Sequence, residues 1–283
     1  MKSKQFSAIC PSGTKFLFEA YYAPGKMEIV RAIIDEELTY SDRLLHIIYT
    51  CTLCGGCQAQ CDDVNIIKPV KILQELRNQI VEELGPLPAH KRFAESINKN
   101  HNPYLEPHET RVKGLLENVK DNPDAKILYF IGCTSTYREK QIAKATLNLL
   151  NYFGIKYTIL GYEEWCCGSP LFMTGQKSDG IKQMHHNLNA IQKRKCEKVI
   201  FSCAGCYRTF KTIYPQFTTY NFEVLHITEF LGKFVKKHRK KMKKLNETVT
   251  YHDPCHLGRH SKVYDAPRKL IKMIPSINFV EME

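Results

Sequence analysis

Five cysteines share one spacing, Cys-x32-Cys-Cys-x35-Cys-x2-Cys, and they are the residues of this chain whose types and positions most clearly predict chemistry. They are Cys133, Cys166, Cys167, Cys203 and Cys206. A tetrahedral zinc ion takes four ligands. Five thiolates that converge on one place therefore favour a multi-iron cluster. The adjacent pair puts two of these thiols on one tight turn.

Short apolar runs at residues 127–131, 157–160 and 199–201 precede these cysteines. From residue 126 onward such runs alternate with helical patterns, which predicts a parallel sheet. We expect the three runs to be parallel strands, so that all five sulfurs emerge at the carboxyl edge where open α/β sheets place their ligands. Helices are expected at 178–194, 206–213 and 227–244.

One helix of this region shows an apolar face at helical intervals, and Gly154 follows it at the usual C′ position. The face consists of Ile142, Ala145, Leu149, Leu150 and Phe153.

The five-cysteine pattern, with Cys166-Cys167-Gly168 at its centre, resembles the CCG cysteine-rich domain family. That family includes the catalytic subunits of heterodisulfide reductase and the iron–sulfur subunits of glycolate and lactate oxidases. The resemblance implies an unusual non-cubane [4Fe-4S] cluster held through these five positions, with Gly168 beside it.

A second group, Cys51, Cys54, Cys57 and Cys61, has the Cys-x2-Cys-x2-Cys-x3-Cys spacing of bacterial ferredoxins. The short steps let three thiolates surround one face of a [4Fe-4S] cubane. The pair Gly55-Gly56 lets backbone amides approach the cluster closely.

The fourth ligand of this cubane has two candidates. In two-cluster ferredoxins the last cysteine of such a run binds the other cluster, which favours Cys10 here. The Cys10-Pro11 stretch and the following residues 22–33 resemble the segment between the two motifs of glycolate-oxidase-type ferredoxin domains. Residues 1–9 hold no cysteine, and Asp62 stands where that family has proline, so we expect one cubane. In the alternative, Cys61 completes the cubane and Cys10 is structural.

A zinc ribbon and a disulfide framework are two other interpretations of the cysteines, and both fit the sequence less well. A zinc ribbon at 51–61 would need a second cysteine pair. A disulfide framework would need an oxidising compartment, and the first nine residues show no apolar leader segment. Cys196 precedes a strand instead of following one, so we interpret it as a buried small hydrophobe.

The composition predicts a cytoplasmic chain that meets a membrane only through a partner, because no stretch approaches the apolar length of a membrane span. The formal net charge is +12, and much of it lies in residues 236–244. This basic segment is interpreted either as the solvated end of a helix or as a docking patch for an acidic redox partner or an anionic thiol. No nucleic-acid reader motif accompanies it, so no nucleic acid is expected.

The fold class is α+β overall, in four parts. Residues 1–88 are expected to form an α-helical ferredoxin-like domain, 89–124 a polar linker, and 125–246 the first α/β CCG module. Residues 247–283 would begin a second CCG module that stays incomplete. Its Cys255 follows a strand as Cys133 does, and lies near the basic residues Arg259 and Lys262, whereas the next Cys-Cys pair is expected near 287–295 by the family spacing. His252 and His256 are interpreted as structural or partner-facing.

These patterns predict an iron–sulfur oxidoreductase subunit that relays electrons from the cubane to the five-cysteine cluster for disulfide and thiol redox chemistry. No dinucleotide or phosphate-binding glycine motif is present, so no flavin is expected in this chain. A flavoprotein or ferredoxin-type donor in a hetero-oligomer would then supply electrons. The alternatives are an electron-transfer subunit of a flavin-linked 2-hydroxy-acid oxidase or dehydrogenase, and a non-catalytic iron sensor or scaffold.

Overall fold

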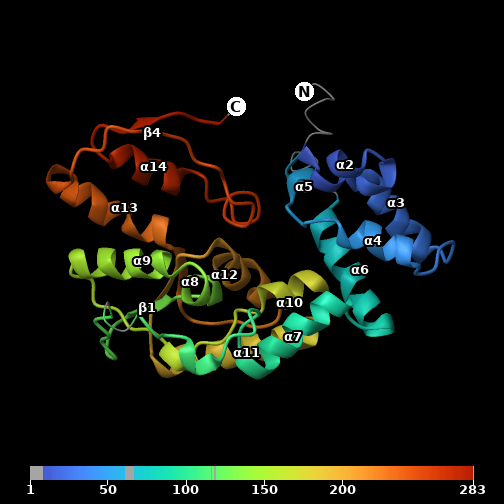
Figure 1. Ribbon diagram of the computed structural model, residues 1–283, viewed down its shortest axis with the longest axis horizontal. Coiled ribbons are helices and arrows are strands. Elements are labelled where there is room, and N and C mark those ends of the chain that lie inside the picture. The colour runs from blue at the N-terminus through green and yellow to red at the C-terminus, as the bar shows by residue number, and fades with distance from the viewer. Residues whose placement is uncertain (1–8, 61–66, 116, 118, 283) are drawn as a thin grey trace. The chain divides into compact units, whose positions relative to one another are not determined.

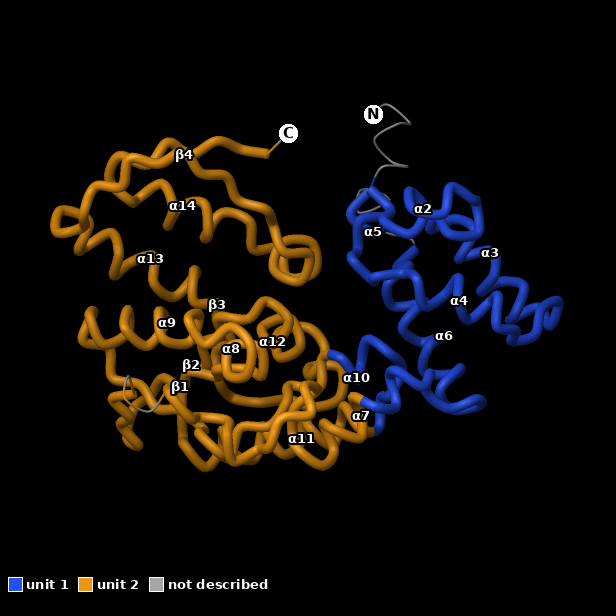
Figure 2. Tube along the Cα trace, viewed as in Figure 1, with its two compact units in different colours: residues 1–92, 170–178 blue, residues 93–169, 179–283 orange. Residues whose placement is uncertain are grey.

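The chain divides into two compact units (Figures 1 and 2). A computed structural model describes residues 9–60, 67–115, 117 and 119–282. Unit 1 comprises residues 1–92 and 170–178, and unit 2 comprises residues 93–169 and 179–283. The upstream cysteine run thus belongs to unit 1, and the five-cysteine pattern belongs to unit 2.

The described part of unit 1 is helical, as its sequence predicts. Its elements are α2 (Pro11–Phe16), the 3-10 turn η1 (Glu19–Tyr21), α3 (Ala23–Ile34), α4 (Asp42–Tyr49), α5 (Gly56–Gln60) and α6 (Pro69–Leu84). The hydroxyl of Ser41 caps α4 by accepting a hydrogen bond from the Leu44 N–H at 3.3 Å. Helix α6 stops at Gly85, whose φ of 79° is unfavourable for other residues.

The Pro24-Gly25 pair marks the start of a helix, after residues 17–22, which contain only the 3-10 turn η1. Both residues lie in the first turn of α3. Proline is tolerated there because its missing N–H would have no helical partner in any case. A Cβ on Gly25 would lie 2.3 Å from the Glu19 carbonyl oxygen, so the glycine permits a close approach between η1 and α3.

A hydrophobic core joins the helices of unit 1 to the loop that carries the cysteines. Its buried members come from α4, from α6 and from the cysteine loop: Leu44, Ile48, Leu53, Val70, Leu73, Leu76 and Ile80. Leu53 lies between Cys51 and Cys54 and is 1% exposed. Burial of this side chain fixes the loop, because any shift of the neighbouring cysteines would pull Leu53 out of the core.

The segment 89–124, predicted as a polar linker, begins with a regular helix instead. Helix α7 spans Pro88–Asn100 and buries Ala94, Ser96 and Ile97. Its sequence is mostly polar because only one narrow face packs inward. A single 3-10 turn, η2 (His108–Thr110), follows it.

A parallel three-stranded sheet forms the centre of unit 2, in the order β1 (Ile127–Phe130), β2 (Lys198–Phe201) and β3 (Glu223–His226). The register pairs Phe130 with Phe201, and Phe201 with His226. The predicted parallel arrangement is therefore confirmed for the first and third apolar runs. The run at 157–160 forms only isolated bridges, in which Thr158 pairs with Leu128 of β1.

Helices cover both faces of this sheet (Figure 1). α9 (Lys140–Tyr152) and α13 (Ile227–His238) share one hydrophobic core with Tyr129, Ile131 and Ile200 of the sheet region. α11 (Lys177–Lys193) lies on the opposite side. The short helices α8 (Cys133–Tyr137), α10 (Ser169–Thr174) and α12 (Ala204–Arg208) begin close to the cysteines, and α12 continues into a π-helical turn, Thr209–Ile213.

The apolar face predicted for α9 is largely wrong. Ile142 and Leu149 are 39% and 40% exposed, whereas Ala143 and Leu147 are fully buried together with Leu150. The helix carries two apolar stripes, and both satisfy the helical period. The predicted end of the helix is confirmed, since Gly154 follows with a φ of 63°.

A second, two-stranded parallel sheet ends the described chain. It pairs β4 (Thr248–Val249) with β5 (Asn278–Phe279), and α14 (Asp265–Met273) connects the two strands. Helix α14 packs against α13. The basic segment 236–244 covers the last turn of α13 and the residues after it, and it is mostly exposed to solvent. Within the described residues, no helix has both the length and the apolar character that a membrane crossing requires.

Candidate iron–sulfur sites

The five cysteines of unit 2 lie at the carboxyl end of the parallel sheet. Cys133 opens α8 three residues after β1, and Cys203 caps α12 two residues after β2. Cys206 lies inside α12, and the pair Cys166-Cys167 precedes α10. This is the edge at which the strand pattern predicts them.

Side-chain interactions that shift thiol pKa values link the five cysteines into one continuous row. They connect Cys133 with Cys166, Cys166 with Cys167, Cys167 with Cys206, and Cys206 with Cys203. Four of these side chains are buried, and Cys203 is half-buried. The structure thus brings together every cysteine of the pattern, although they span 74 residues of sequence from Cys133 to Cys206.

The row has alternating proton affinities. Hydrogen bonds from Cys166 and Cys206 hold the pKa of Cys167 well below its usual value, and a bond from Cys206 lowers the pKa of Cys203. The pKa values of Cys166 and Cys206 are raised well above the usual value, because these thiols donate to their neighbours and are buried. Thiolates are the form that binds metals, and Cys167 and Cys203 are the members of the row whose pKa values are lowered.

Backbone and side-chain contacts hold the Cys166-Cys167 turn. The amide of Asn187 accepts from the Trp165 N–H and donates to the Cys166 carbonyl, both at 3.0 Å. The hydroxyl of Tyr214 donates to the Cys167 carbonyl at 3.0 Å. The N–H of Gly168 donates to the Cys166 sulfur at 3.4 Å, so this glycine supplies a backbone amide to the site.

Gly132 is a site residue that sequence reasoning missed. Its φ is 82°, and a Cβ at this position would lie 3.0 Å from the Cys206 sulfur. Both facts require glycine, since a side chain would strain the backbone and crowd the sulfur row. The signal in the sequence is its place directly after a strand and before Cys133.

A buried ion pair, also missed, adjoins the sulfur row. Arg111 donates from one guanidinium nitrogen to Glu164 and from another to the Cys133 sulfur at 3.8 Å. Both side chains are 1% exposed. Burial acts to lower the pKa of Arg111, but the negative charges of Glu164 and Cys133 outweigh it, so the pKa is raised. No local sequence signal marks Arg111, because its partner lies 53 positions away.

An aromatic stack borders the same site. The indole of Trp165 lies between the imidazoles of His101 and His186, with ring centroids 3.7 and 3.5 Å apart and planes 5° from parallel. The carbonyl of His101 accepts from the Cys166 N–H at 2.9 Å. The stack therefore joins helix α11 and the end of α7 to the cysteine pair.

The first residues of the second module approach the five-cysteine group. His256 lies 3.3 Å from a guanidinium nitrogen of Arg208 on α12, and burial lowers the pKa of His256 to about 4. Arg208 is also close enough to Cys255 to interact with it electrostatically. The contact with Arg208 accords with a structural role for His256, and His252 is exposed.

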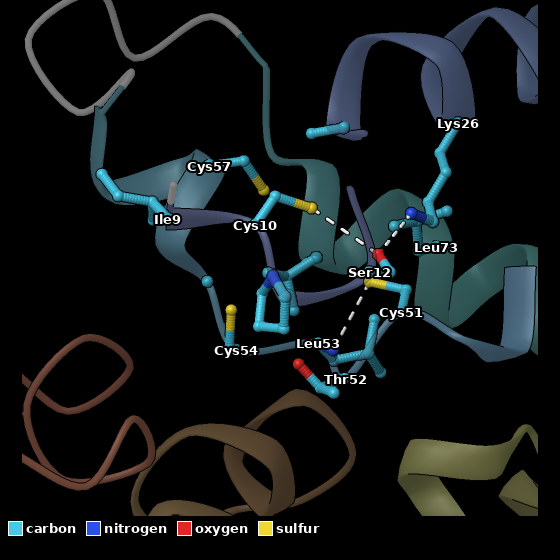
Figure 3. A pocket seen from close by; sticks show the side chains of 14 residues that line it. Ile9, Cys10, Ser12, Lys26, Cys51, Thr52, Leu53, Cys54, Cys57 and Leu73 are labelled. Carbon is cyan, nitrogen blue, oxygen red and sulfur yellow. Dashed lines mark hydrogen bonds between the residues drawn. The ribbon is translucent and has the colours of Figure 1, made fainter. Parts of the chain in front are cut away.

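In unit 1, the four cysteines Cys10, Cys51, Cys54 and Cys57 line one pocket. Cys10 and Cys57 lie on one side of it, and Cys51 and Cys54 lie on the other (Figure 3). Cys61 falls outside the described residues. Gly55 has a φ of 72°, and a Cβ on Gly56 would lie 2.5 Å from the Ile9 side chain. The two glycines thus allow the tight turn that joins Cys54 to Cys57.

A buried lysine lies at the edge of this pocket. The ammonium of Lys26 donates to the Ser12 hydroxyl at 2.8 Å and to the Tyr21 carbonyl. Burial lowers the pKa of Lys26, while the nearby thiolates of Cys51, Cys10 and Cys57 act to raise it. Burial raises the pKa of Cys57 to about 11, and the negative charge of Cys51 adds to this. The pocket therefore combines four sulfurs with one internal cation.

Cys196 belongs to neither group. Its thiol contacts the carbonyls of Ala125 and Arg194 at 3.6 Å, at the amino end of β2 and so at the opposite end of that strand from Cys203. Among the described residues every cysteine is a free thiol. Within the same residues, no three histidine, cysteine or acidic side chains are arranged to hold a single metal ion.

Comparison with known proteins identifies the family. The cysteine-rich CCG domain matches residues 127–211 and 249–283. The chain is 40% identical over 243 residues to a subunit of the dihydromethanophenazine:CoB–CoM heterodisulfide reductase of Methanosarcina mazei, which covers 83% of this chain and 59% of the relative. It is 35% identical over 238 residues to a subunit of the CoM/CoB fumarate reductase of Methanothermobacter marburgensis, with 83% of this chain and 46% of the relative covered.

A third relative, an iron–sulfur protein of Methanococcus maripaludis, is 34% identical over 242 residues, or 83% of this chain and 46% of the relative. No solved structure matches the fold. The chain spans about three fifths or less of the length of these curated relatives. The sulfur row lies within the matched CCG domain, and the chain belongs to the CCG-domain iron–sulfur oxidoreductases, with clear similarity to a heterodisulfide reductase subunit.

Proposed function

We propose that this chain is the electron-relaying iron–sulfur subunit of a heterodisulfide-reductase-like enzyme that carries out disulfide and thiol redox chemistry. The observation that carries the proposal is the division of nine cysteines into a pocket of four and a row of five. Similarity to a heterodisulfide reductase subunit supplies the reaction class.

The pocket of unit 1 fits a [4Fe-4S] cubane, which four thiolates hold. Cys10, Cys51, Cys54 and Cys57 would be its ligands. Cys10 reaches the pocket because its thiol contacts the Tyr21 carbonyl and the Ser12 hydroxyl, both at 3.6 Å, and these contacts fix the start of α2. The internal charge of Lys26 would offset part of the negative charge of four thiolates.

The row of unit 2 fits a larger group than a single ion. Its five sulfurs are Cys133, Cys166, Cys167, Cys203 and Cys206, and they match the ligand set of the non-cubane [4Fe-4S] cluster that the family resemblance implies. The room left by Gly132 and the amide supplied by Gly168 favour such a group, since hydrogen bonds to sulfurs help to set cluster potentials.

Iron–sulfur clusters, when bound, take up and release single electrons, whereas the protein supplies position and electrostatics. Here the cysteine loop anchored by Leu53 and the turn anchored by Asn187 and Tyr214 hold the ligands in place. Arg111 and Lys26 keep positive charge beside each thiolate group.

The first two relatives named above are subunits of reductases. We propose that this chain likewise acts with other redox subunits, with a flavoprotein or a ferredoxin-type protein as its electron donor.

Iron and sulfide analysis of anaerobically purified protein, with EPR spectra, tests the proposal. Two clusters of four irons predict about eight irons per chain. Cys133→Ser should remove about four irons and one EPR signal, whereas Cys196→Ser, a change of another buried thiol, should remove none. A zinc-only preparation would contradict the proposal. Rapid disulfide reduction by this chain alone would contradict the need for partners, and co-purification with a 2-hydroxy-acid-oxidising flavoprotein would favour the other enzyme class.

A further inference from the structure

We propose that Arg111 tunes the reduction potential of the five-cysteine site, by holding a positive charge against the Cys133 sulfur in a position that Glu164 fixes. The proposal rests on the function proposed above, because it assigns Arg111 a role toward the cluster that these cysteines would hold. Arg111 acts through a ligand, so it is a positioning residue for electron transfer and not a ligand itself.

The Arg111 side chain places a buried positive charge next to a ligand sulfur. One guanidinium nitrogen donates to the Cys133 sulfur at 3.8 Å, and a second donates to Glu164. The side chain is 1% exposed, so water cannot screen the charge. At low effective dielectric, a charge this close interacts with a thiolate several times more strongly than it would at the surface.

Glu164 connects Arg111 to the backbone of the site and so fixes the position of the guanidinium. Its two carboxylate oxygens accept from the N–H groups of Ile131 at 2.9 Å and Gly132 at 2.7 Å. Those residues lead directly into Cys133, and Glu164 itself lies two positions before Cys166. One carboxylate therefore links both ligand-bearing segments to the guanidinium and leaves it little freedom to turn away.

Stability alone does not explain such a pair. Burying two charges costs more in lost hydration than their attraction often returns, and well-packed apolar residues can replace buried pairs without loss of stability. A function for the charge is the simpler explanation. Each electron added to a cluster increases its negative charge, and a fixed neighbouring cation stabilises that reduced state. The charge and the hydrogen bonds around the sulfurs are the features through which proteins adjust cluster potentials.

The chain offers a matched control in an adjacent ion pair. Arg194 and Glu163 form a salt bridge of 2.7 Å, but their side chains are 27% and 48% exposed. Glu163 directly precedes Glu164 in sequence. Changes in this pair alter the same charges in the same unit, but they act through solvent and do not touch any of the five cysteines of the row.

The test measures iron content and the midpoint potential of the five-cysteine signal, by EPR-monitored titration with dithionite, in the full chain. Arg111→Gln should move the potential to a more negative value, and Arg111→Lys should stay closer to the unmodified protein. Glu164→Gln should move it to a more positive value, because it leaves the guanidinium uncompensated. Arg194→Gln and Glu163→Gln should shift the potential less than either buried variant.

Arg111→Gln and Glu164→Gln are expected to shift the midpoint potential in opposite directions. A purely structural role would instead give both variants the same kind of defect. The proposal is overturned if Arg111→Gln keeps its iron with an unchanged potential, or if both partners shift the potential the same way. It is also overturned if Arg111→Gln and Arg111→Lys both lose the iron of this site. An unmodified chain without iron would instead overturn the proposed function, so the two failures are distinguishable.

Discussion

The ammonium of Lys26 and the hydroxyl of Ser12 form a hydrogen bond of 2.8 Å inside unit 1, and both side chains are buried. The Ser12 hydroxyl in turn donates a hydrogen bond to the Tyr21 carbonyl at 2.8 Å. The Cys10 thiol contacts the same carbonyl. A charged group from α3 thus fixes the segment that presents Cys10 to the pocket (Figure 3).

Replacing Lys26 should therefore weaken the four-cysteine site. Lys26→Met removes the cation and its two buried hydrogen bonds, and hydrogen bonds to charged groups are worth about 1.5–3 kcal/mol each in unfolding free energy. We expect loss of iron from this site and a weaker cubane EPR signal, with the five-cysteine signal retained. Lys15→Met, a change of an exposed lysine on α2, is the control. Equal iron content in the two variants would show that Lys26 does not support the site.

The choice between Cys10 and Cys61 is open to a direct comparison. Cys10 lines the pocket with the other three cysteines, so Cys10→Ser should abolish or strongly alter the cubane EPR signal. Cys61→Ser should leave it nearly intact, because the last thiol of this ferredoxin spacing serves another cluster in two-cluster ferredoxins. Loss of the signal in Cys61→Ser alone would reverse the assignment.

Gly132→Ala should disturb the five-cysteine site selectively. Gly132 has a φ of 82° and a ψ of 154°, a region that is essentially confined to glycine and costs other residues about 1–3 kcal/mol, and here the new Cβ would also press on the Cys206 sulfur at 3.0 Å. We expect loss of iron from this site. Gly154→Ala imposes a similar backbone cost, but nothing lies within 4 Å of its Cβ, so this variant should keep its iron. If both variants lose stability and iron to the same degree, the sulfur contact is irrelevant.

Acidification should destabilise unit 2 through His226. Burial lowers the pKa of His226 to about 4, whereas an unfolded histidine has a pKa of about 6.5. Between these values the unfolded chain binds more protons, so stability falls as the pH drops from about 6.5 toward 4, by up to about 3 kcal/mol in unfolding free energy.

Urea unfolding at pH 7 and pH 5 measures this loss. His226 caps α13 by accepting from the Thr228 N–H. His226→Asn keeps a cap acceptor but removes the titration, so its stability should depend less on pH. An unchanged pH dependence in His226→Asn would assign the acid sensitivity to other groups.

Sequence spacing predicted the parts of the site that depend on local pattern. A cysteine that follows a buried strand must lie at the carboxyl edge if the strands are parallel, and Cys133 and Cys203 do so. The apolar face of α9 was not predictable in the same way, because Ile142 and Ala143 both belong to regular apolar stripes. Only the size of the space beside the sheet decides which stripe is buried.

Arg111 and Glu164 show the other limit of sequence reasoning. A charged residue in a polar segment is expected to face water, and nothing near Arg111 in sequence indicates burial. Its burial depends on Glu164, which depends in turn on the amides at the end of β1. This buried ion pair forms only when three segments that are distant in sequence come together, so the structure is needed to identify it.

The stack of Trp165 between two imidazoles has a practical consequence. Trp165 is the single tryptophan of the chain, and the next residue along the chain is Cys166. Indole emission is quenched by a coloured chromophore a few bonds away, so the tryptophan fluorescence of this protein comes from one residue and reports on the five-cysteine site. Assembly and loss of a cluster at the five-cysteine row could then be followed in real time by tryptophan fluorescence, without any added label.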